Sequence, residues 1–264
     1  MQFINDFIRS QPDGGLANYG LMGTIGQGAM LLVVVAYLLR VKADWKDWLK
    51  GIAIGFIAFE FSVFAQNLFT WYRSGFALDS YQQISNIAVS FTALPLVAWL
   101  CAKTFNASVG FAGDVTALTL LGFHTFGRSG CMFAGCCYGF PCEWGIYSHH
   151  TGGLQFPVVW VESLFTLAIL VFLLVRTCRK GYTPDGKNLP YFLLLYGVCR
   201  FFSEMTREST RDWWLFWRIS DVHFHMLVMA AVGGLLLWHR VKKESLDRVG
   251  EGVPLPALKR RRRG

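Results

Sequence analysis

The sequence predicts an all-α integral membrane protein with about seven transmembrane helices, and three observations support this fold class. Hydrophobic residues make up 53% of the 264 residues, whereas only 16% are charged. A soluble domain carries about a quarter charged residues, so this composition favours a membrane protein. The apolar residues lie in separate blocks, most of them long enough to cross a hydrocarbon core of about 30 Å. The 10 Trp and 9 Tyr residues are typical of aromatic belts at two membrane surfaces.

Each predicted span is an apolar block that ends at basic or aromatic residues. The first block stops at Arg40, the third at Lys103 and the fifth at Arg176. The fourth block is shorter and carries Asp114 and His124. In chain order, we expect spans at residues 17–39, 51–69, 84–102, 109–126, 157–175, 189–205 and 222–238.

The distribution of basic residues predicts the orientation of these spans. With the N-terminus outside, all but seven of the 25 Lys and Arg residues fall in cytoplasmic segments, as the positive-inside rule requires. We therefore expect a multi-pass protein of the bacterial inner (cytoplasmic) membrane, with its N-terminus outside and its C-terminus in the cytoplasm. The long polar connection 127–155 and the segment 207–220 then lie at the outer face.

The chain is expected to form one polytopic membrane domain, residues 1–245, followed by a basic cytoplasmic tail, residues 246–264. The first eighteen residues contain Asp6 and Arg9 and no apolar run, so no cleavable signal peptide is expected. Much of the net charge of +8 comes from the tail, and no nucleic-acid-binding motif accompanies it. We therefore expect the partners to be membrane lipids and not nucleic acid.

The sixth predicted span contains an unusual set of charged residues. Arg200, Glu204 and Arg207 are four and three positions apart, which places them on one face of a helix. Charges inside a span are costly and usually face the interior of the bundle. Arg128 lies in Gly127-Arg128-Ser129-Gly130, where the fourth span ends. A guanidinium fork suits a phosphodiester, so an anionic phospholipid head group between Arg128 and Arg200 is the simplest ligand. A structural ion pair that holds two helices together is the alternative.

Four cysteines lie within twelve residues of the outer connection, at Cys131, Cys136, Cys137 and Cys142. Three interpretations remain open. The cysteines form structural disulfides at an oxidising face, or one thiolate is a nucleophile with His124, His149 or His150 as its base. In the third interpretation they bind zinc with one of these histidines, but the usual Cys-x2–4-Cys pairs are absent. We expect no metal site.

Four stretches resemble the prolipoprotein diacylglyceryl transferase family in both order and spacing. Tyr19-Gly20-Leu21-Met22 resembles the opening of the family's first span, and Gly127-Arg128-Ser129-Gly130 resembles the start of its signature. Pro157 and Glu162 match two residues of the stretch that opens the next span. Tyr196-Gly197-Val198-Cys199-Arg200-Phe201, with Glu204 and Arg207, resembles the family's Tyr-Gly-x-x-Arg-Phe-x-x-Glu-x-x-Arg. By these residues the chain is identified as a member of a divergent, cysteine-rich branch, and the family's seven-span, N-out topology agrees with the spans above.

The resemblance implies an activity and roles for particular residues. The family transfers diacylglycerol from phosphatidylglycerol to the lipobox cysteine thiol of a prolipoprotein and releases glycerol phosphate. Arg128 and Arg200 would then be catalytic and hold the phosphoglycerol leaving group, because cations stabilise the charge that develops on a departing phosphate. Glu204 would orient Arg200, and no cofactor is required. The implied substrate-binding residues are Tyr19, Gly130, Glu162 and Arg207.

The sequence also departs from the family pattern. Cys131, Ala134 and Cys136 replace two Asn residues and the Glu of the signature, and the His-Gly-Gly stretch has no counterpart between residues 80 and 100. We hypothesise that Cys131 and Cys136 take part in substrate binding and that His124 replaces the missing histidine as a catalytic base. The acceptor stays open and is a protein thiol or a glycan at the periplasmic face.

Three functions are compatible with these residues. The first is a membrane transferase with an anionic, phosphatidylglycerol-like donor that moves a diacylglyceryl or phosphoglycerol group to an acceptor at the outer face. The second is a thiol-dependent acyltransferase or redox enzyme with Cys136 or Cys137 reactive. The third is a non-catalytic lipid-binding or transport homologue. Attack by an enzyme thiol on the glycerol carbon would end in a stable thioether, whereas a thioester can turn over, so a covalent diacylglyceryl intermediate does not fit. We predict the first function.

Overall fold

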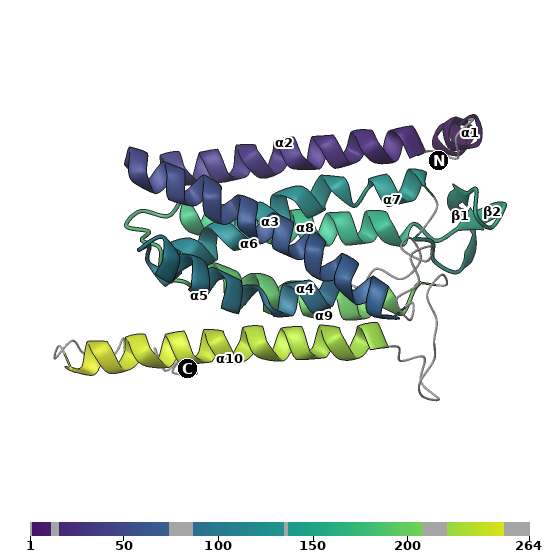
Figure 1. Ribbon diagram of the computed structural model, residues 1–264. Helices are drawn as coiled ribbons and strands as arrows, with labels where there is room; N and C mark the ends of the chain where they lie inside the picture. Colours follow the sequence, from purple (N-terminus) through teal and green to yellow (C-terminus); the bar gives the residue numbers. More distant parts are fainter. Residues whose placement is uncertain (1, 12–15, 74–86, 135–136, 208–220, 251–264) are drawn as a thin grey trace, which may run out of the picture.

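The computed structural model describes residues 2–11, 16–73, 87–134, 137–207 and 221–250. Its long helices run side by side along one axis (Figure 1). Among the described residues, five helices are long and apolar enough to cross a bilayer. This result confirms the predicted class of helical membrane protein. The five are α2 (Leu16–Arg40), α3 (Trp45–Arg73), α6 (Val109–Gly127), α8 (Val158–Thr177) and α10 (Asp221–Gly250).

The other two predicted spans form shorter helices. Residues 84–102 correspond to α4 (Ile87–Thr92) and α5 (Leu94–Thr104), which are separated at Ala93. Pro95 explains the break, because its ring would clash with the carbonyl group of Phe91 in a continuous helix but is tolerated in the first turn of α5. The sixth span corresponds to α9 (Asn188–Glu204), which has only 17 residues. The count of seven spans is therefore not confirmed.

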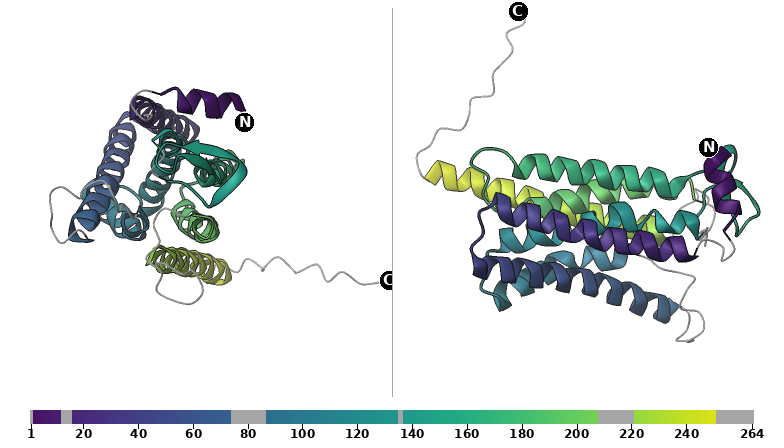
Figure 2. Two further views of the ribbon diagram at one scale, coloured as in Figure 1. Left: turned by 90° about the vertical axis from the view of Figure 1, so that its right-hand side faces the viewer. Right: turned by 90° about the horizontal axis from the view of Figure 1, so that it is seen from above.

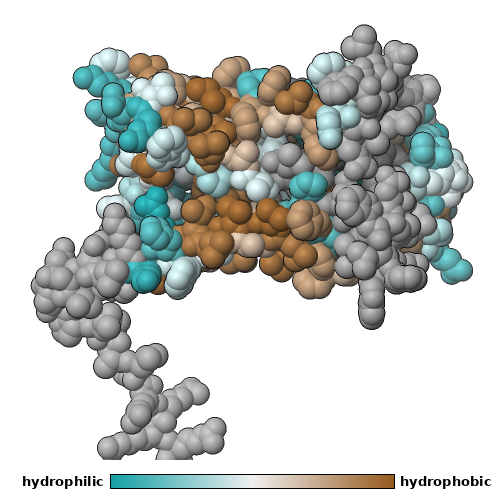
Figure 3. Space-filling model, turned by 60° about the horizontal axis from the view of Figure 1, so that its bottom comes forward, coloured by the Kyte–Doolittle hydropathy of each residue, from teal (hydrophilic) through white to brown (hydrophobic). Residues whose placement is uncertain are grey.

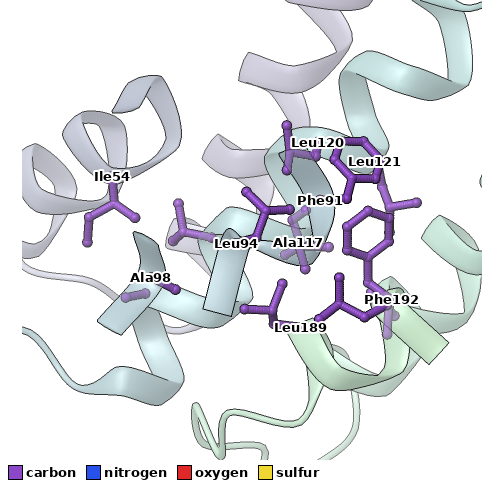
Figure 4. Packing of buried hydrophobic residues seen from close by; sticks show 14 of the residues in the cluster. Ile54, Phe91, Leu94, Ala98, Ala117, Leu120, Leu121, Leu189 and Phe192 are labelled. Carbon is purple, nitrogen blue, oxygen red and sulfur yellow. The ribbon is translucent and has the colours of Figure 1, made fainter. Parts of the chain in front are cut away.

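Helix α6 lies at the centre of the bundle and packs against α2, α3, α5, α8 and α9. Most of its side chains are buried, and Gly122 allows α2 to come close: a Cβ atom there would lie 2.9 Å from the Cα atom of Met30. The main hydrophobic core forms around Leu121 of α6, with Phe91 of α4 and Phe192 of α9 packed beside it (Figure 4). The ends of α4 and α9 are thus fixed by contacts to α6.

A polar network joins four helices at the end of the bundle predicted to face the cytoplasm. Asp114 of α6 is fully buried, and its carboxylate accepts hydrogen bonds from Tyr37 of α2, at 2.9 Å, and from Tyr182. The amide of Asn188 in α9 donates to the Tyr182 hydroxyl at 3.0 Å and accepts from Arg176 of α8. Because buried polar groups need partners, this network fixes α2, α6, α8 and α9 relative to one another.

The opposite, predicted outer end carries a small folded cap (Figure 1). It consists of α1 (Gln2–Arg9), α7 (Gly130–Phe133) and the antiparallel strands β1 (Pro141–Ser148) and β2 (Gly153–Gln155). The side chain of Asn5 in α1 donates to the carbonyl of Gly145 at 3.2 Å and accepts from the backbone N–H of Tyr147 at 2.9 Å. The cap has its own apolar cluster, which includes Ile8 and Ile146. The connection that was expected to be a long polar loop is therefore largely structured.

The surface has the pattern of a membrane protein. A hydrophobic band covers the middle of the face in Figure 3, and hydrophilic residues gather toward the ends of the bundle. Helix α10 runs along the side of the bundle and ends, at Gly250, far from α1 (Figure 2). It therefore extends five residues into the segment predicted as a tail, and residues 251–264 lie outside the described part of the chain.

Candidate functional site

Five charged side chains meet just inside the outer cap. Arg128 directly follows α6, Glu162 lies in the second turn of α8, and Arg200 and Glu204 lie in the last turns of α9. Arg207 lies three residues after the end of α9 and forms an antiparallel β-bridge with Gly139. Four of the five are no more than 5% exposed, and the side chain of Arg128 is 11% exposed. Three helix ends therefore bring together residues that are up to 79 positions apart in the sequence.

Glu162 is the centre of this cluster. Its Oε2 atom accepts from Arg128 Nε at 2.9 Å, and its Oε1 atom accepts from Arg207 Nη2 at 2.9 Å. The Nη1 group of Arg200 also contacts Oε1, and the Ser203 hydroxyl donates to the same atom at 3.3 Å. One carboxylate thus holds three guanidinium groups in fixed positions.

Glu204 holds two of the same arginines from the other side. Its Oε2 atom lies 2.8 Å from Arg200 Nη2 and 3.5 Å from Arg207 Nε. The expected pairing of Glu204 with Arg200 on one helix face is therefore present. Among the described residues, three guanidinium groups and two carboxylates meet in this cluster. Guanidinium groups match the geometry of carboxylates and phosphates, so such a cluster suits an anionic ligand. The ion pairs also join α8 to α9, so the structural alternative left open by the sequence is present, whereas head-group binding stays a prediction.

His124 lies on α6 one turn before Arg128 and is 4% exposed. Its Nε2 atom shares a 2.8 Å hydrogen bond with the hydroxyl of Tyr196, and its ring packs edge-to-face against Phe91. Tyr196 lies on α9 one turn before Arg200. The pair thus forms a second polar layer, one helical turn further into the bundle than Arg128 and Arg200.

Tyr19 and Gly130 meet where α7 crosses the start of α2. A Cβ atom at Gly130 would lie 3.0 Å from the carbonyl oxygen of Tyr19, so only glycine allows this approach without displacement. The ring of Tyr19 is about half exposed. Ser129 shares a 3.2 Å hydrogen bond with Ser163 of α8. The segment around Arg128 is thereby held between α2 and α8.

The described cysteines of the outer connection lie in different surroundings. Cys131 is buried in the apolar cluster of the cap, whereas Cys142 lies in β1. The thiol of Cys137 lies 3.6 Å from Arg207 Nη1 and is the cysteine that the described structure brings to the cluster. Cys136, expected in substrate binding, lies outside the described residues. No described cysteine is joined to another described cysteine by a disulfide.

Three features of the site were not predicted from the sequence. Ser203 donates a hydrogen bond to Glu162, and its position between Arg200 and Glu204 on α9 could have indicated that it belongs to the site. His223 of α10 is only 2% exposed and packs edge-to-face on Phe201, although a polar residue at the start of a span looks like an interfacial cap. Gly139 lies between two chain segments: a Cβ atom there would be 2.7 Å from the carbonyl oxygen of Thr206.

Comparison with known proteins identifies the family. The profile of prolipoprotein diacylglyceryl transferase matches residues 88–239, which is more than half of the chain. The chain belongs to the prolipoprotein diacylglyceryl transferase family. Three of the four stretches on which the resemblance was based lie inside the matched residues, and the resemblance is confirmed. Membership of this family, with the five apolar helices, makes the chain a multi-pass membrane protein.

Individual bacterial relatives are similar at modest identity. A phosphatidylglycerol–prolipoprotein diacylglyceryl transferase 2 from Clostridium perfringens is 29% identical over 137 residues, which are 48% of this chain and 50% of that protein. The phosphatidylglycerol–prolipoprotein diacylglyceryl transferase of Chlorobaculum tepidum is 28% identical over 58% of this chain and 54% of its own length. The enzyme of the same name from Dehalococcoides mccartyi strain BAV1 is 25% identical over 57% of this chain and 60% of its own length. The matches thus span about half the length of these relatives.

Proposed function

We propose that the protein is a transferase of the bacterial inner membrane with phosphatidylglycerol, or a similar anionic glycerophospholipid, as its donor. It moves a diacylglyceryl or phosphoglycerol group to an acceptor at the periplasmic face. The observation that carries this proposal is the meeting of three arginine guanidinium groups around Glu162, just inside the cap. The names of the relatives support the choice of phosphatidylglycerol among anionic lipids.

The arginines of the cluster suit a phosphodiester. A phosphatidylglycerol phosphate carries one negative charge and offers oxygen acceptors to guanidinium donors. Arg128 is the most exposed of the five residues and is the group that we propose to meet the phosphate first. Arg200, oriented by Glu204, completes the clamp. Charge builds on the phosphate as it leaves, and fixed cations in a water-poor site stabilise this charge strongly.

Transfer of diacylglycerol to a thiol needs no nucleophile from the enzyme. The acceptor sulfur forms a bond to the glycerol carbon while the carbon–oxygen bond to phosphate breaks. Glycerol phosphate leaves with the electron pair of that bond, and the thiol proton passes to a base. We assign the base to His124, one turn from Arg128 and hydrogen-bonded to Tyr196.

One contact favours a second candidate function. The thiol of Cys137 lies 3.6 Å from the guanidinium of Arg207, and a nearby cation promotes the thiolate form of a cysteine. A thiolate at this position supports acyl transfer through a thioester, in which the thiol attacks an acyl carbonyl and the lipid alcohol leaves.

The test is turnover of phosphatidylglycerol by the purified full-length protein in liposomes. The lipid is labelled in its head group, a cysteine peptide is supplied as acceptor, and products are followed by mass spectrometry. Arg128→Gln should lower release of labelled glycerol phosphate by about 100-fold or more. The matched control is Arg40→Gln, because within the described part of the chain Arg40 donates to backbone carbonyls, those of Cys178 and Arg179, at the other end of the bundle.

Each outcome decides between the candidates. Turnover by the wild type and Arg40→Gln, but not by folded Arg128→Gln, supports the phosphate clamp. Loss of turnover in Cys137→Ser, with an acyl-enzyme adduct in the wild type, replaces it with the thiol-dependent function. If the folded wild type turns over no phospholipid but is stabilised by phosphatidylglycerol, the protein is a lipid-binding homologue and the transferase proposal is wrong.

A further inference from the structure

A groove lies between four helices near the predicted cytoplasmic end of the bundle. It has a volume of about 250 Å³ and is lined by residues of α5, α6, α9 and α10. Its walls are mostly apolar and include Trp99 of α5, Leu189 of α9 and Leu236 of α10. Leu189 is only 4% exposed, whereas Trp99 is 44% exposed, so the groove leads from the lipid-facing surface into the bundle.

The groove lies at the depth of lipid head groups and of the first part of their acyl chains. The apolar part of α10 ends at Trp238, two residues before Arg240, which lines the groove. Leu236 is one turn earlier and thus about 6 Å deeper in the membrane. On α5, Pro95 lines the groove eight residues before Lys103, which marks the membrane surface, so this wall reaches about 12 Å below the surface. The groove therefore joins the membrane surface to the hydrocarbon region.

Arg240 is the one charged residue among the described residues that line the groove. Its guanidinium group lies against Gly186, where a Cβ atom would be 3.1 Å from the guanidinium carbon, so the glycine makes room for it. The side chain is half-buried, and no hydrogen bond or ion pair joins it to another described residue. Asp185, the nearest acidic residue in the sequence, is paired with Arg176 and Lys187 instead. The positive charge of Arg240 is thus available to a ligand in the groove.

We infer that the groove binds an anionic phospholipid of the predicted cytoplasmic leaflet, with the phosphate on Arg240 and one acyl chain between the apolar walls. A guanidinium fork donates two hydrogen bonds to one phosphate. The Nζ atom of Lys103 lies 5.7 Å from the ring centre of Trp99 and adds positive charge near the groove. The ammonium group of a zwitterionic head group would meet these cations, so charge favours an anionic lipid. Basic pockets between transmembrane helices are typical sites for such head groups.

The groove is separate from the arginine cluster around Glu162. Both are lined by residues of α9, but Arg200 lies eleven residues after Leu189, which is about 16 Å along the helix axis. The cluster lies just inside the outer cap, whereas the groove lies near the other membrane surface. The inferred lipid is therefore a second one, in addition to the proposed donor, and the inference does not rest on the proposed function.

The test is photo-cross-linking of the purified full-length protein in nanodiscs of phosphatidylcholine. A small fraction of phosphatidylglycerol carries a diazirine in the upper part of one acyl chain, and cross-linked peptides are identified by mass spectrometry. The wild type should be labelled at Leu189, which bulk lipid reaches poorly because it is buried. Arg240→Gln should lower this labelling by about tenfold, because it removes the charged donor to the phosphate. The matched control is Arg179→Gln, which removes the same charge from an exposed residue outside the groove and should leave the labelling unchanged.

Four outcomes overturn the inference. They are a wild type without labelling at Leu189, equal labelling of the wild type and Arg240→Gln, loss of labelling in Arg179→Gln alone, and equal labelling by a phosphatidylcholine with the same diazirine chain. Inorganic phosphate, at an ionic strength matched with chloride, should not displace the lipid probe. If it does, the ligand is a soluble anion and the assignment to a lipid is wrong. Cross-links to the peptide that contains Arg128 report on the outer cluster in the same sample, so the two sites can fail separately.

Discussion

Replacing Glu162 by glutamine should destabilise the protein strongly, although the two side chains have nearly the same shape. The glutamate carboxylate binds Arg128, Arg200 and Arg207 and accepts from Ser203. In Glu162→Gln the three buried guanidinium groups keep only Glu204 as a carboxylate partner among the described residues, and the cluster becomes more positive by one charge. Removal of one partner from a buried ion pair costs about 3–5 kcal/mol.

The assay is thermal or denaturant unfolding of purified protein in nanodiscs that contain only zwitterionic lipid. Anionic lipid is left out because binding to the cluster would hide part of the loss. The control is Asp47→Asn, which makes the same acid-to-amide change at a more exposed ion pair, where Lys50 Nζ lies 3.2 Å from Asp47 Oδ1. An exposed pair of this kind contributes about 0–1 kcal/mol.

A double variant separates lost charge balance from lost shape. Adding Arg207→Gln to Glu162→Gln restores the net charge that the cluster has in the wild type, so the double variant should be more stable than the sum of the two single losses by about 1–3 kcal/mol. The reasoning is refuted if Glu162→Gln costs no more than Asp47→Asn, or if the losses in the double variant simply add.

Three further predictions test the topology, the cytoplasmic network and the cap. A membrane-impermeant maleimide applied to intact spheroplasts should label Cys142, whereas the exposed Cys178 should react only after permeabilisation; the reverse order would invert the orientation. Burial, together with the Asp114 carboxylate, raises the pKa of Tyr182 above its ordinary value of 10.0. Folding thus favours the neutral tyrosine, so its contribution to stability is present below about pH 10 and is lost above it, at no more than about 1.4 kcal/mol per pH unit. When unfolding is measured from pH 8 to 12, the free energy of unfolding should decline less steeply with pH in Tyr182→Phe than in the wild type. Gly139→Ala should cost about 1–3 kcal/mol, because the new methyl group would lie 2.7 Å from the carbonyl oxygen of Thr206, and hydrogen exchange should speed up in β1 while α2 is unchanged.

The apolar blocks predicted the long helices to within a few residues, except where α3 and α10 extend past their blocks, because charged residues set the limits of each block. The end of α2 at Arg40 is an example, whereas the start of α6 at Val109 is set by the N-cap Ser108, whose side chain accepts from the backbone N–H of Phe111. The break before α5 was not predicted, because the apolar block continues through it; Pro95 was the residue in the sequence that indicated the break. The cap could not be predicted, since it depends on contacts such as that of Asn5 with Gly145, 140 residues away.

The candidate site shows the same division between local and distant information. The spacing of Arg200, Glu204 and Arg207 on one helix face follows from the helical repeat, and their mutual contacts are present. The resemblance pointed to Glu162 only as a substrate-binding residue; its position at the centre of the cluster depends on how α8 packs on α9. Cys137 could not be distinguished from its neighbours in the sequence, since the conformation of the turn decides which thiol faces Arg207.

The burial of α6 has a consequence for how the protein is made. Of the five apolar helices, α6 has the lowest hydropathy and by far the largest buried share, 83% of its apolar window. Residues such as Asp114 and His124 are tolerated there because neighbouring helices, and not lipid, surround them. A segment of this kind gains little from entering lipid alone, so its insertion during synthesis depends on α2 and α3, which emerge from the ribosome first and form its nearest walls. The bundle is then assembled around the helix that partitions least into lipid, and a defect in α2 should appear as failed insertion of α6 before any loss of the proposed activity.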